Sequence, residues 1–318
     1  MDSSVVFLFS GQGSQYYHMG KNLYLNNPVF RNSMDKLDKM IKKITGTSVL
    51  GVLYNENVKK SETFNSIQYT HPSIFMVEYS IAQVFIEMNI YPDYVLGTSL
   101  GEFASCAIAG VMSCEEILEC IIEQAKMIEK NCCRGGMLTI VNDHKLYFEN
   151  RILNENSQIV AINYNSHFVV SGRIDGLKEI ESHLKNKGIL YLRLPVLFGF
   201  HSSFIDSAAL SYNNFLASKI YSQPRTNVIS CTEGNKVTSF SKSYFWDVIR
   251  KKIDFPSALK SISDEEKHIY IDLGPSGTLA NFTKYNLSKA SKSSIHSVIT
   301  PFNNEINNLE KLLILLGR

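Results

Sequence analysis

The sequence predicts an α/β protein with a large domain built on a mostly parallel sheet and a small inserted ferredoxin-like domain. Short apolar strands alternate with helical segments through residues 1–134, and this order favours a parallel sheet with helices on both sides. Residues 135–197 read βαββαβ, which is the pattern of a ferredoxin-like unit. Residues 198–318 return to helices and isolated strands, so we expect them to complete the large domain.

The first part of the large domain contains predicted strands at 5–9 and 91–96 and predicted helices at 29–43, 70–88 and 113–130. Thr70 is expected to cap the second helix, with Pro72 in its first turn. In the third helix, Gln124 falls on the same face as Ile121 and Ile128. An amide on an apolar face needs hydrogen-bond partners, so Gln124 is either satisfied in the core or lines a pocket.

In the small domain, strands are expected at 137–141, 158–163, 168–171 and 189–194, with helices at 144–154 and 175–187. Asp175 is expected to cap the second of these helices, and Gly188 to end it. The remaining chain predicts helices at 205–218 and 307–316 and strands at 228–231 and 268–273.

The amino-acid composition indicates a globular protein and argues against nucleic-acid and membrane partners. The chain of 318 residues is 44% hydrophobic and 19% charged, which is typical of a soluble globular protein. The formal charge of +2, without a basic block, argues against a nucleic-acid partner. No stretch approaches the about 20 apolar residues of a spanning helix, and the run at 5–9 is too short for a signal sequence, so we expect no membrane association and a cytoplasmic location. The six cysteines and eight histidines show no metal-binding spacing; no metal is predicted, and the cysteines are expected to be reduced.

The stretch from Tyr94 to Glu102 carries the clearest chemical signal. Three apolar residues run into Gly97-Thr98-Ser99-Leu100-Gly101, and helical spacing follows. A G-x-S-x-G turn between a strand and a helix is a nucleophile elbow, which exposes its serine and directs the helix N-terminus at a developing oxyanion. The bare motif also occurs by chance, but the flanking strand and helix favour the catalytic interpretation. Ser99 is therefore the candidate nucleophile of an α/β-hydrolase-like large domain.

A serine nucleophile needs a general base, which is normally distant in sequence. His201, in Phe200-His201-Ser202, lies among aromatic residues just before a predicted helix. Such a histidine is more often a packing residue, but the other histidines fit the role of a base less well. His18 and His71 near helix starts remain possible, whereas the rest stand in polar or surface-like contexts: His144, His167, His183, His268 and His296. A glycine loop at 10–15 follows the first strand and lacks the spacing of a nucleotide-binding loop.

Together these motifs resemble the malonyl-CoA:acyl-carrier-protein transacylase family over nearly the whole chain. The matching stretches are Gly11-Gln12-Gly13-Ser14-Gln15, the elbow from Gly97 to Glu102, Phe200-His201-Ser202 and Asp272-Leu273-Gly274-Pro275. The likeness is closest to the discrete acyltransferase-like proteins of trans-acyltransferase polyketide pathways, particularly the acyl hydrolases that clear stalled acyl groups from carrier proteins.

The resemblance implies roles for individual residues. Ser99 would be the nucleophile and His201 its base, oriented by a backbone carbonyl, so that Asp206 need not be a triad member. The amides of Gln12 and Leu100 would form the oxyanion hole, and Asn163 would lie near the cleft. The family also implies an inserted ferredoxin-like domain. No cofactor is implied, because the acyl group arrives on the phosphopantetheine arm of an acyl carrier protein.

The sequence departs from the family in three places. Gln124 stands where the malonyl enzymes have an arginine that pairs with the substrate carboxylate, and a neutral amide cannot replace that pairing. Thr98 replaces the usual histidine before the serine, and His71 replaces a common glutamine before a proline; we expect both to reshape the pocket. Phe200 keeps the bulk that the family's malonyl-type pockets have.

These observations predict a serine-dependent acyl-transfer enzyme that acts on non-carboxylated acyl groups held on carrier protein. Water as the second acceptor makes the enzyme an acyl-carrier-protein hydrolase, and family likeness favours this outcome. A second thiol as acceptor makes it a transacylase that loads carrier proteins. A noncatalytic carrier-protein-binding homologue and a simple esterase are alternatives of other classes. The former would lose the serine and histidine, and the latter would ordinarily carry an acid between them.

Overall fold

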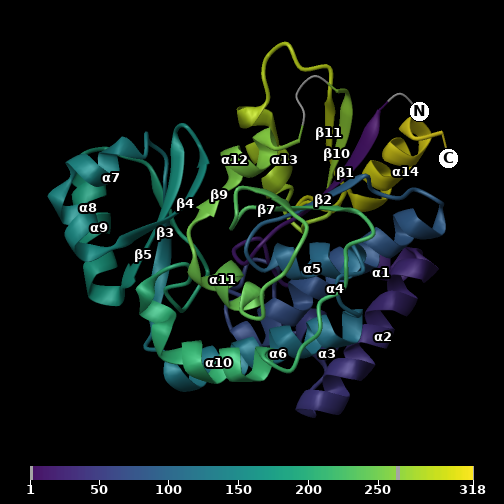
Figure 1. Ribbon diagram of the computed structural model, residues 1–318, viewed down its shortest axis with the longest axis horizontal. Coiled ribbons are helices and arrows are strands. Elements are labelled where there is room, and N and C mark those ends of the chain that lie inside the picture. The colour runs from purple at the N-terminus through teal and green to yellow at the C-terminus, as the bar shows by residue number, and fades with distance from the viewer. Residues whose placement is uncertain (1–2, 263–265, 318) are drawn as a thin grey trace.

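The computed structural model describes residues 3–262 and 266–317, which form two sheets with helices packed around them (Figure 1). The strands of the larger sheet are β1 (Ser4–Phe9), β2 (Tyr94–Gly97), β7 (Asn227–Ser230), β8 (Asn235–Val237), β10 (His268–Asp272) and β11 (Ser294–Ser297). Those of the smaller sheet are β3 (Gly135–Ile140), β4 (Gln158–Tyr164), β5 (His167–Arg173), β6 (Tyr191–Arg193) and β9 (Ile253–Asp254).

The helices divide between the two sheets. Those of the larger unit are α1 (Lys21–Asn26), α2 (Pro28–Thr45), α3 (Val49–Leu53), α4 (Ile67–Glu87), α5 (Gly101–Ile108), α6 (Cys114–Asn131), α10 (Ala209–Leu216), α11 (Tyr244–Arg250), α12 (Phe255–Lys260), α13 (Thr278–Asn286) and α14 (Glu305–Leu315). A 3-10 helix, Ser203–Ala208, precedes α10. The smaller unit carries α7 (Lys145–Glu149), α8 (Arg151–Asn156) and α9 (Ile174–Asn186), at the left of Figure 1.

The larger sheet has the strand order β11-β10-β1-β2-β7-β8. Neighbours from β11 to β7 are parallel, whereas β8 runs antiparallel to β7, so the sheet is mixed. Residues Val5 to Phe9 of the central strand β1 are all buried, as expected for a strand covered by helices on both faces. Strand β8 could not be predicted from the sequence, because it is short, mostly exposed and polar.

The smaller sheet has the order β6-β3-β5-β4-β9, and its first four strands are antiparallel neighbours. This part has the predicted βαββαβ order and its own apolar core, which includes Leu138, Phe168 and Leu177. Strand β9 pairs in parallel with β4 although it lies beyond residue 197. One short strand of the smaller sheet therefore comes from the segment that otherwise belongs to the larger unit.

Four of the predicted helices differ from the structure in how they begin or in their continuity. Helix α4 begins at Ile67 after Ser66, so Thr70 is a buried interior residue rather than a cap and Pro72 lies inside the helix. The buried Ile67 side chain accounts for the earlier start, because it extends the apolar stripe by a turn. The predicted helix at 144–154 is interrupted at Asn150, whose side chain accepts a hydrogen bond from the Leu153 amide and caps α8.

The other two differences concern helix starts. Asp175 lies in the first turn of α9 and does not cap it, whereas Gly188 follows the end of that helix with a φ of +66°, as predicted. The helix predicted at 205–218 begins as the 3-10 helix, with the Ser202 hydroxyl accepting from the Phe204 amide. The first turns are thus tighter than the apolar spacing alone indicated.

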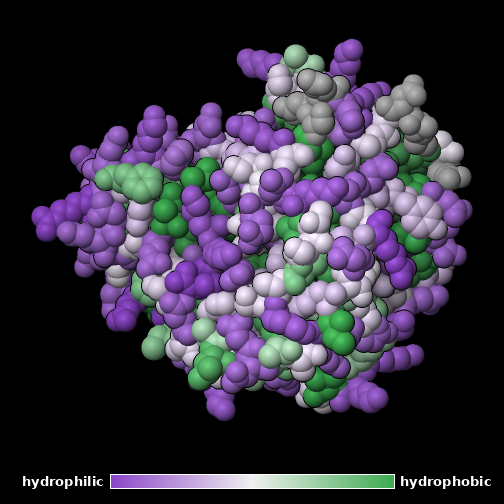
Figure 2. Space-filling model, in the orientation of Figure 1, coloured by the Kyte–Doolittle hydropathy of each residue, from purple (hydrophilic) through white to green (hydrophobic). Residues whose placement is uncertain are grey.

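Hydrophilic side chains cover most of the face shown in Figure 2, and the hydrophobic ones form small, separate patches there. Among the helices of the described residues, none is both long and apolar enough to span a membrane.

Candidate active site

Ser99 stands in a sharp turn between β2 and α5. Its φ is +53°, in the left-handed region that residues other than glycine seldom adopt. The turn is possible because Gly101 packs against β1: a Cβ atom there would lie 2.0 Å from the Phe9 carbonyl oxygen. The local structure around Ser99 is therefore the strand, turn and helix that the G-x-S-x-G pattern predicts.

His201 lies directly beside Ser99 although 102 positions separate them. The distance from Ser99 Oγ to His201 Nε2 is 2.8 Å. On the other side of the ring, Nδ1 lies 2.9 Å from the carbonyl oxygen of Lys251, and the His201 amide donates to the Ile249 carbonyl at 2.8 Å. A carbonyl can only accept, so Nδ1 carries the proton and Nε2 is free to accept from the serine hydroxyl.

Burial lowers the pKa of His201 to about 4, against the opposing effect of the Lys251 carbonyl. The imidazole is therefore uncharged at neutral pH, as a general base must be. Within the described part of the chain, the His201 ring contacts Ser99 and the Lys251 carbonyl, whereas Asp206 forms an ion pair with Arg250. The Lys251 carbonyl was not found from the sequence, because every residue carries a carbonyl and only the fold selects one.

The glycine loop after β1 lies against the serine. A Cβ atom on Gly11 would be 2.7 Å from Ser99 Cβ and 3.3 Å from Ser99 Oγ. The side chain of Gln15 holds the loop, since its Nε2 donates to the carbonyls of Phe64 at 3.0 Å and Pro195 at 3.1 Å. Among the described residues, the backbone amides of Gln12 and Leu100 donate no hydrogen bond. Both amides remain available to a ligand near Ser99.

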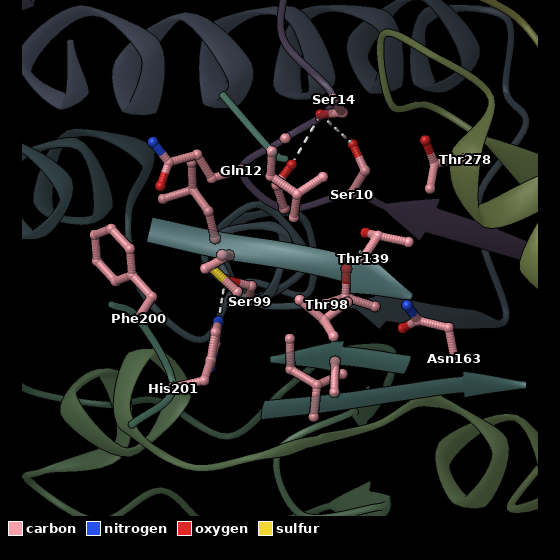
Figure 3. A pocket seen from close by; sticks show the side chains of 18 of the residues that line it. Ser10, Gln12, Ser14, Thr98, Ser99, Thr139, Asn163, Phe200, His201 and Thr278 are labelled. Carbon is pink, nitrogen blue, oxygen red and sulfur yellow. Dashed lines mark hydrogen bonds between the residues drawn. The ribbon is translucent and has the colours of Figure 1, made fainter. Parts of the chain in front are cut away.

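A cavity of about 280 Å³ opens around Ser99 and His201, and both units of the protein line it. Figure 3 shows Gln12 and Phe200 on one side of the Ser99–His201 pair, and Thr139, Asn163 and Thr278 on the other. Within the described part of the chain, the lining contains no lysine, arginine, aspartate or glutamate. The histidines are therefore the only described residues of this lining whose side chains can become positively charged.

The structure brings Gln124 and His71 together in this wall. Gln124 is fully buried and His71 is 2% exposed, and the His71 ring is tilted against Phe200 with ring centroids 5.5 Å apart. Burial lowers the pKa of His71 to about 4, and the nearby Gln124 side chain opposes this shift. In the described residues, neither side chain has a hydrogen-bond partner of good geometry. This end of the cavity is thus polar but neutral.

Thr98 and Asn163, the remaining candidate residues, also line the cavity. Asn163 Nδ2 lies 2.9 Å from His167 Nδ1. The backbone carbonyl of Asn163 accepts a hydrogen bond from Asn286 Nδ2 at 2.7 Å. The expected context of His167 is polar or surface-like; its contact with Asn163 is polar, but the residue lines the cavity, where burial lowers its pKa. The predicted strands at 158–163 and 168–171 leave out both His167 and its cross-strand partner Tyr164, so no signal for this position was available in the sequence.

Comparison with known proteins identifies the family. The model of the acyl transferase domain family matches residues 6–318. The chain belongs to this family. Two relatives of the acyl transferase family match it along nearly their full length. The polyketide biosynthesis acyltransferase homolog PksD of Bacillus subtilis is 44% identical, with 97% of this chain and 95% of the relative covered. BaeD of Bacillus velezensis, which has the same description, is 42% identical, with 98% and 96% covered.

Solved structures show the same acyl transferase fold at lower identity. The acyl transferase domain of SpnD has a TM-score of 0.88 and 23% identity, covering 99% of this chain and 76% of the other. A malonyl-transacylase in complex with a type II polyketide synthase acyl-carrier protein has a TM-score of 0.81 and 19% identity, covering 97% and 100%. The predicted fold class, a large α/β unit with a smaller ferredoxin-like one, is confirmed.

Proposed function

We propose that the protein is a serine-dependent acyl-transfer enzyme of polyketide biosynthesis that takes acyl groups from acyl carrier protein thioesters. The observation that carries the proposal is the 2.8 Å contact between Ser99 Oγ and His201 Nε2, with Nδ1 held by the Lys251 carbonyl. This arrangement supplies a nucleophile and a neutral base oriented by a third group. The relatives named for polyketide biosynthesis support the setting, and the malonyl-transacylase complex supports the carrier-protein partner.

The proposed reaction begins when Ser99 Oγ attacks the thioester carbonyl while its proton passes to His201 Nε2. The oxyanion of the tetrahedral intermediate accepts hydrogen bonds from the amides of Gln12 and Leu100. The carbon–sulfur bond then breaks, and His201 returns the proton to the leaving thiolate of the phosphopantetheine arm. An ester on Ser99 results.

The fate of this ester defines the activity. We propose that water attacks it, with His201 removing the proton, so that a free acid leaves and the serine is regenerated. Such a hydrolase would unblock or proofread carrier proteins that hold the wrong acyl group. Transfer to a second thiol, which would load a carrier protein, is the alternative within the same mechanism. A noncatalytic carrier-binding homologue is disfavoured because Ser99 and His201 are both present and in contact.

The uncharged cavity supports non-carboxylated acyl groups as substrates. A malonyl carboxylate placed near Gln124 and His71 would meet no cation, because no lysine or arginine of the described residues lines the cavity. Leaving a buried charge without its partner costs roughly 3–5 kcal/mol, which corresponds to a few hundredfold or more in rate. We therefore expect acetyl-like groups to be accepted and malonyl groups to be rejected.

Intact-protein mass spectrometry tests the proposal. The protein is incubated with acetyl- or malonyl-carrier protein, with and without a second free carrier protein. Without a second carrier protein, release of free carrier protein and acetate in excess of one equivalent per enzyme, absent in Ser99→Ala, supports hydrolysis. An acetyl adduct that persists until a second carrier protein is added supports transfer. Efficient malonyl transfer to the second carrier protein would contradict both the selectivity and the hydrolytic outcome. No adduct and no turnover with either thioester would support the noncatalytic alternative.

A further inference from the structure

A buried glutamate holds the start of the glycine loop. The Ser10 backbone amide donates to Glu78 Oε1 at 2.7 Å, and Ser10 Oγ lies 2.8 Å from the same oxygen. Glu78 is on α4 and is fully buried. Ser10 Oγ is also 3.0 Å from Ser14 Oγ, and Ser14 Oγ donates to the Gly11 carbonyl at 2.8 Å. Figure 3 marks both contacts of Ser14 with dashed lines. Helix α4 is thus connected to the loop through one carboxyl oxygen.

Two glycines pack closely against Ser10. A Cβ atom on Gly274 would lie 2.3 Å from Ser10 Oγ, and one on Gly101 would lie 2.8 Å from the Ser10 carbonyl oxygen. The next residue, Gly11, is the one that packs against Ser99. A shift of Ser10 would therefore be passed directly to Gly11 and to the amide of Gln12.

From this geometry we propose that Glu78 is a positioning residue, which fixes Ser10 and thereby places the Gln12 amide over Ser99. The inference rests on the proposed function, because it assigns Glu78 a role only if Gln12 stabilises an oxyanion. Burial raises the pKa of Glu78 well above the ordinary value, and the buried Asp272 adds to this shift. Glutamine offers the same acceptor oxygen without charge, whereas leucine offers none.

A serine-directed fluorophosphonate tests this role, since its reaction needs both an activated Ser99 and an oxyanion hole but no particular acyl group. Labelling rates are followed by intact mass for the wild type, Glu78→Gln, Glu78→Leu and Ser10→Ala. We expect Glu78→Gln to stay within about threefold of the wild type and Glu78→Leu to slow by ten- to a hundredfold. The upper value approaches the loss of a whole oxyanion donor. Ser10→Ala, which keeps the backbone contact, should fall between them.

Ser80→Ala is the matched control. Ser80 is buried on the same helix and contacts Ser33 Oγ at 2.8 Å, away from the loop. This variant should lower the melting temperature and leave the labelling rate unchanged. With acyl-carrier protein as substrate, Glu78→Leu should lower kcat and keep KM within about twofold after kcat is normalised to the folded fraction from circular dichroism. The normalisation is needed because a partly unfolded sample also lowers the apparent kcat without changing KM.

Each outcome decides a different question. Absence of labelling in the wild type would count against the proposed function. Normal labelling in Glu78→Leu, or labelling in folded Glu78→Gln as slow as in Glu78→Leu, would overturn the role of Glu78 while leaving Ser99 reactive. If Glu78→Leu does not fold, Ser10→Ala decides: a rate equal to that of the wild type would overturn the inference, and a slower one would support it.

Discussion

Gln124 on α6 and His71 on α4 form a neutral polar pair in the wall of the cavity, beside Phe200. His71 is uncharged at neutral pH because burial lowers its pKa to about 4, and the Gln124 amide offsets this shift only in part. Neither residue can supply the cation that a carboxylated acyl group would need. The selectivity of the cavity can therefore be tested by introducing one positive charge, at Gln124.

Gln124→Arg should increase the rate of Ser99 acylation by malonyl-carrier protein, relative to acetyl-carrier protein, by at least tenfold. A guanidinium at this buried position could pair with the malonyl carboxylate through two hydrogen bonds. The unliganded variant should also be less stable, because its charge is then buried without a partner. Rates are measured by intact mass with equal concentrations of the two thioesters.

Gln124→Met is the matched control for this change, since it keeps a long unbranched side chain and adds no charge. It should leave malonyl acylation as slow as in the wild type. An equal gain in both variants would mean that space, and not charge, limits malonyl binding.

Ser99 and His201 should behave as one unit. We expect Ser99→Ala and His201→Gln each to lower turnover of acetyl-carrier protein by about a thousandfold or more, and the double variant to lower it no further, because residues that act together in one step are not additive. Steady-state rates of carrier-protein release measure this. A double variant slower than both single ones by the product of their effects would contradict a shared step.

Much of this site could be predicted from the sequence because the signals are local. Apolar spacing predicts the strand before Ser99 and the helix after it, and the two glycines beside Ser99 allow the sharp turn between them. His201 could be found only by chemical need, since a reactive serine requires a base. Its distance from Ser99 in the sequence carries no information about their contact, which arises where β2 and the segment before the 3-10 helix meet.

The remaining features depend on packing between distant segments. The Lys251 carbonyl orients His201 only because α11 ends beside it, and no side chain marks that position. Strand β9 is too short to show a period and exists only by pairing with β4. Glu78 reads in the sequence as one polar residue in a helix, and its function emerges only when the loop at Ser10 is placed against it. These features arise from tertiary packing, which the local spacing of apolar and polar residues does not encode.

Asp206→Asn separates this site from an esterase with a full triad. Asp206 is half exposed and pairs with Arg250, so we expect turnover to stay within about twofold. An exposed ion pair of this kind contributes only about 0–1 kcal/mol to stability. Turnover and melting temperature are measured together. A loss of a hundredfold or more would show that Asp206 reaches His201 during the reaction, as a triad acid does.

The pH dependence of Ser99 labelling reports on His201. Because the pKa of His201 is lowered to about 4, its base form is already present well below neutrality. The rate of fluorophosphonate labelling should therefore be flat from about pH 8 to about pH 5.5 and fall only as the pH approaches 4, whereas a histidine with the ordinary pKa would lose half its base form near pH 6.5. Labelling at half its maximal rate near pH 6.5 would contradict the neutral, buried base.

Folding must be followed over the same range, because the lowered pKa values of His71 and His201 also affect stability. Both side chains bind protons more readily when the chain is unfolded, so their contribution to the free energy of unfolding is complete above about pH 6.5 and is lost as the pH falls toward 4. Asp272, with its pKa raised to about 6, works in the opposite direction over that interval. Circular dichroism at each pH identifies the range in which the protein is folded. Within that range, His71→Gln should show the labelling profile of the wild type, because it leaves His201 as the base; a profile shifted by this variant would assign the titration to His71 instead.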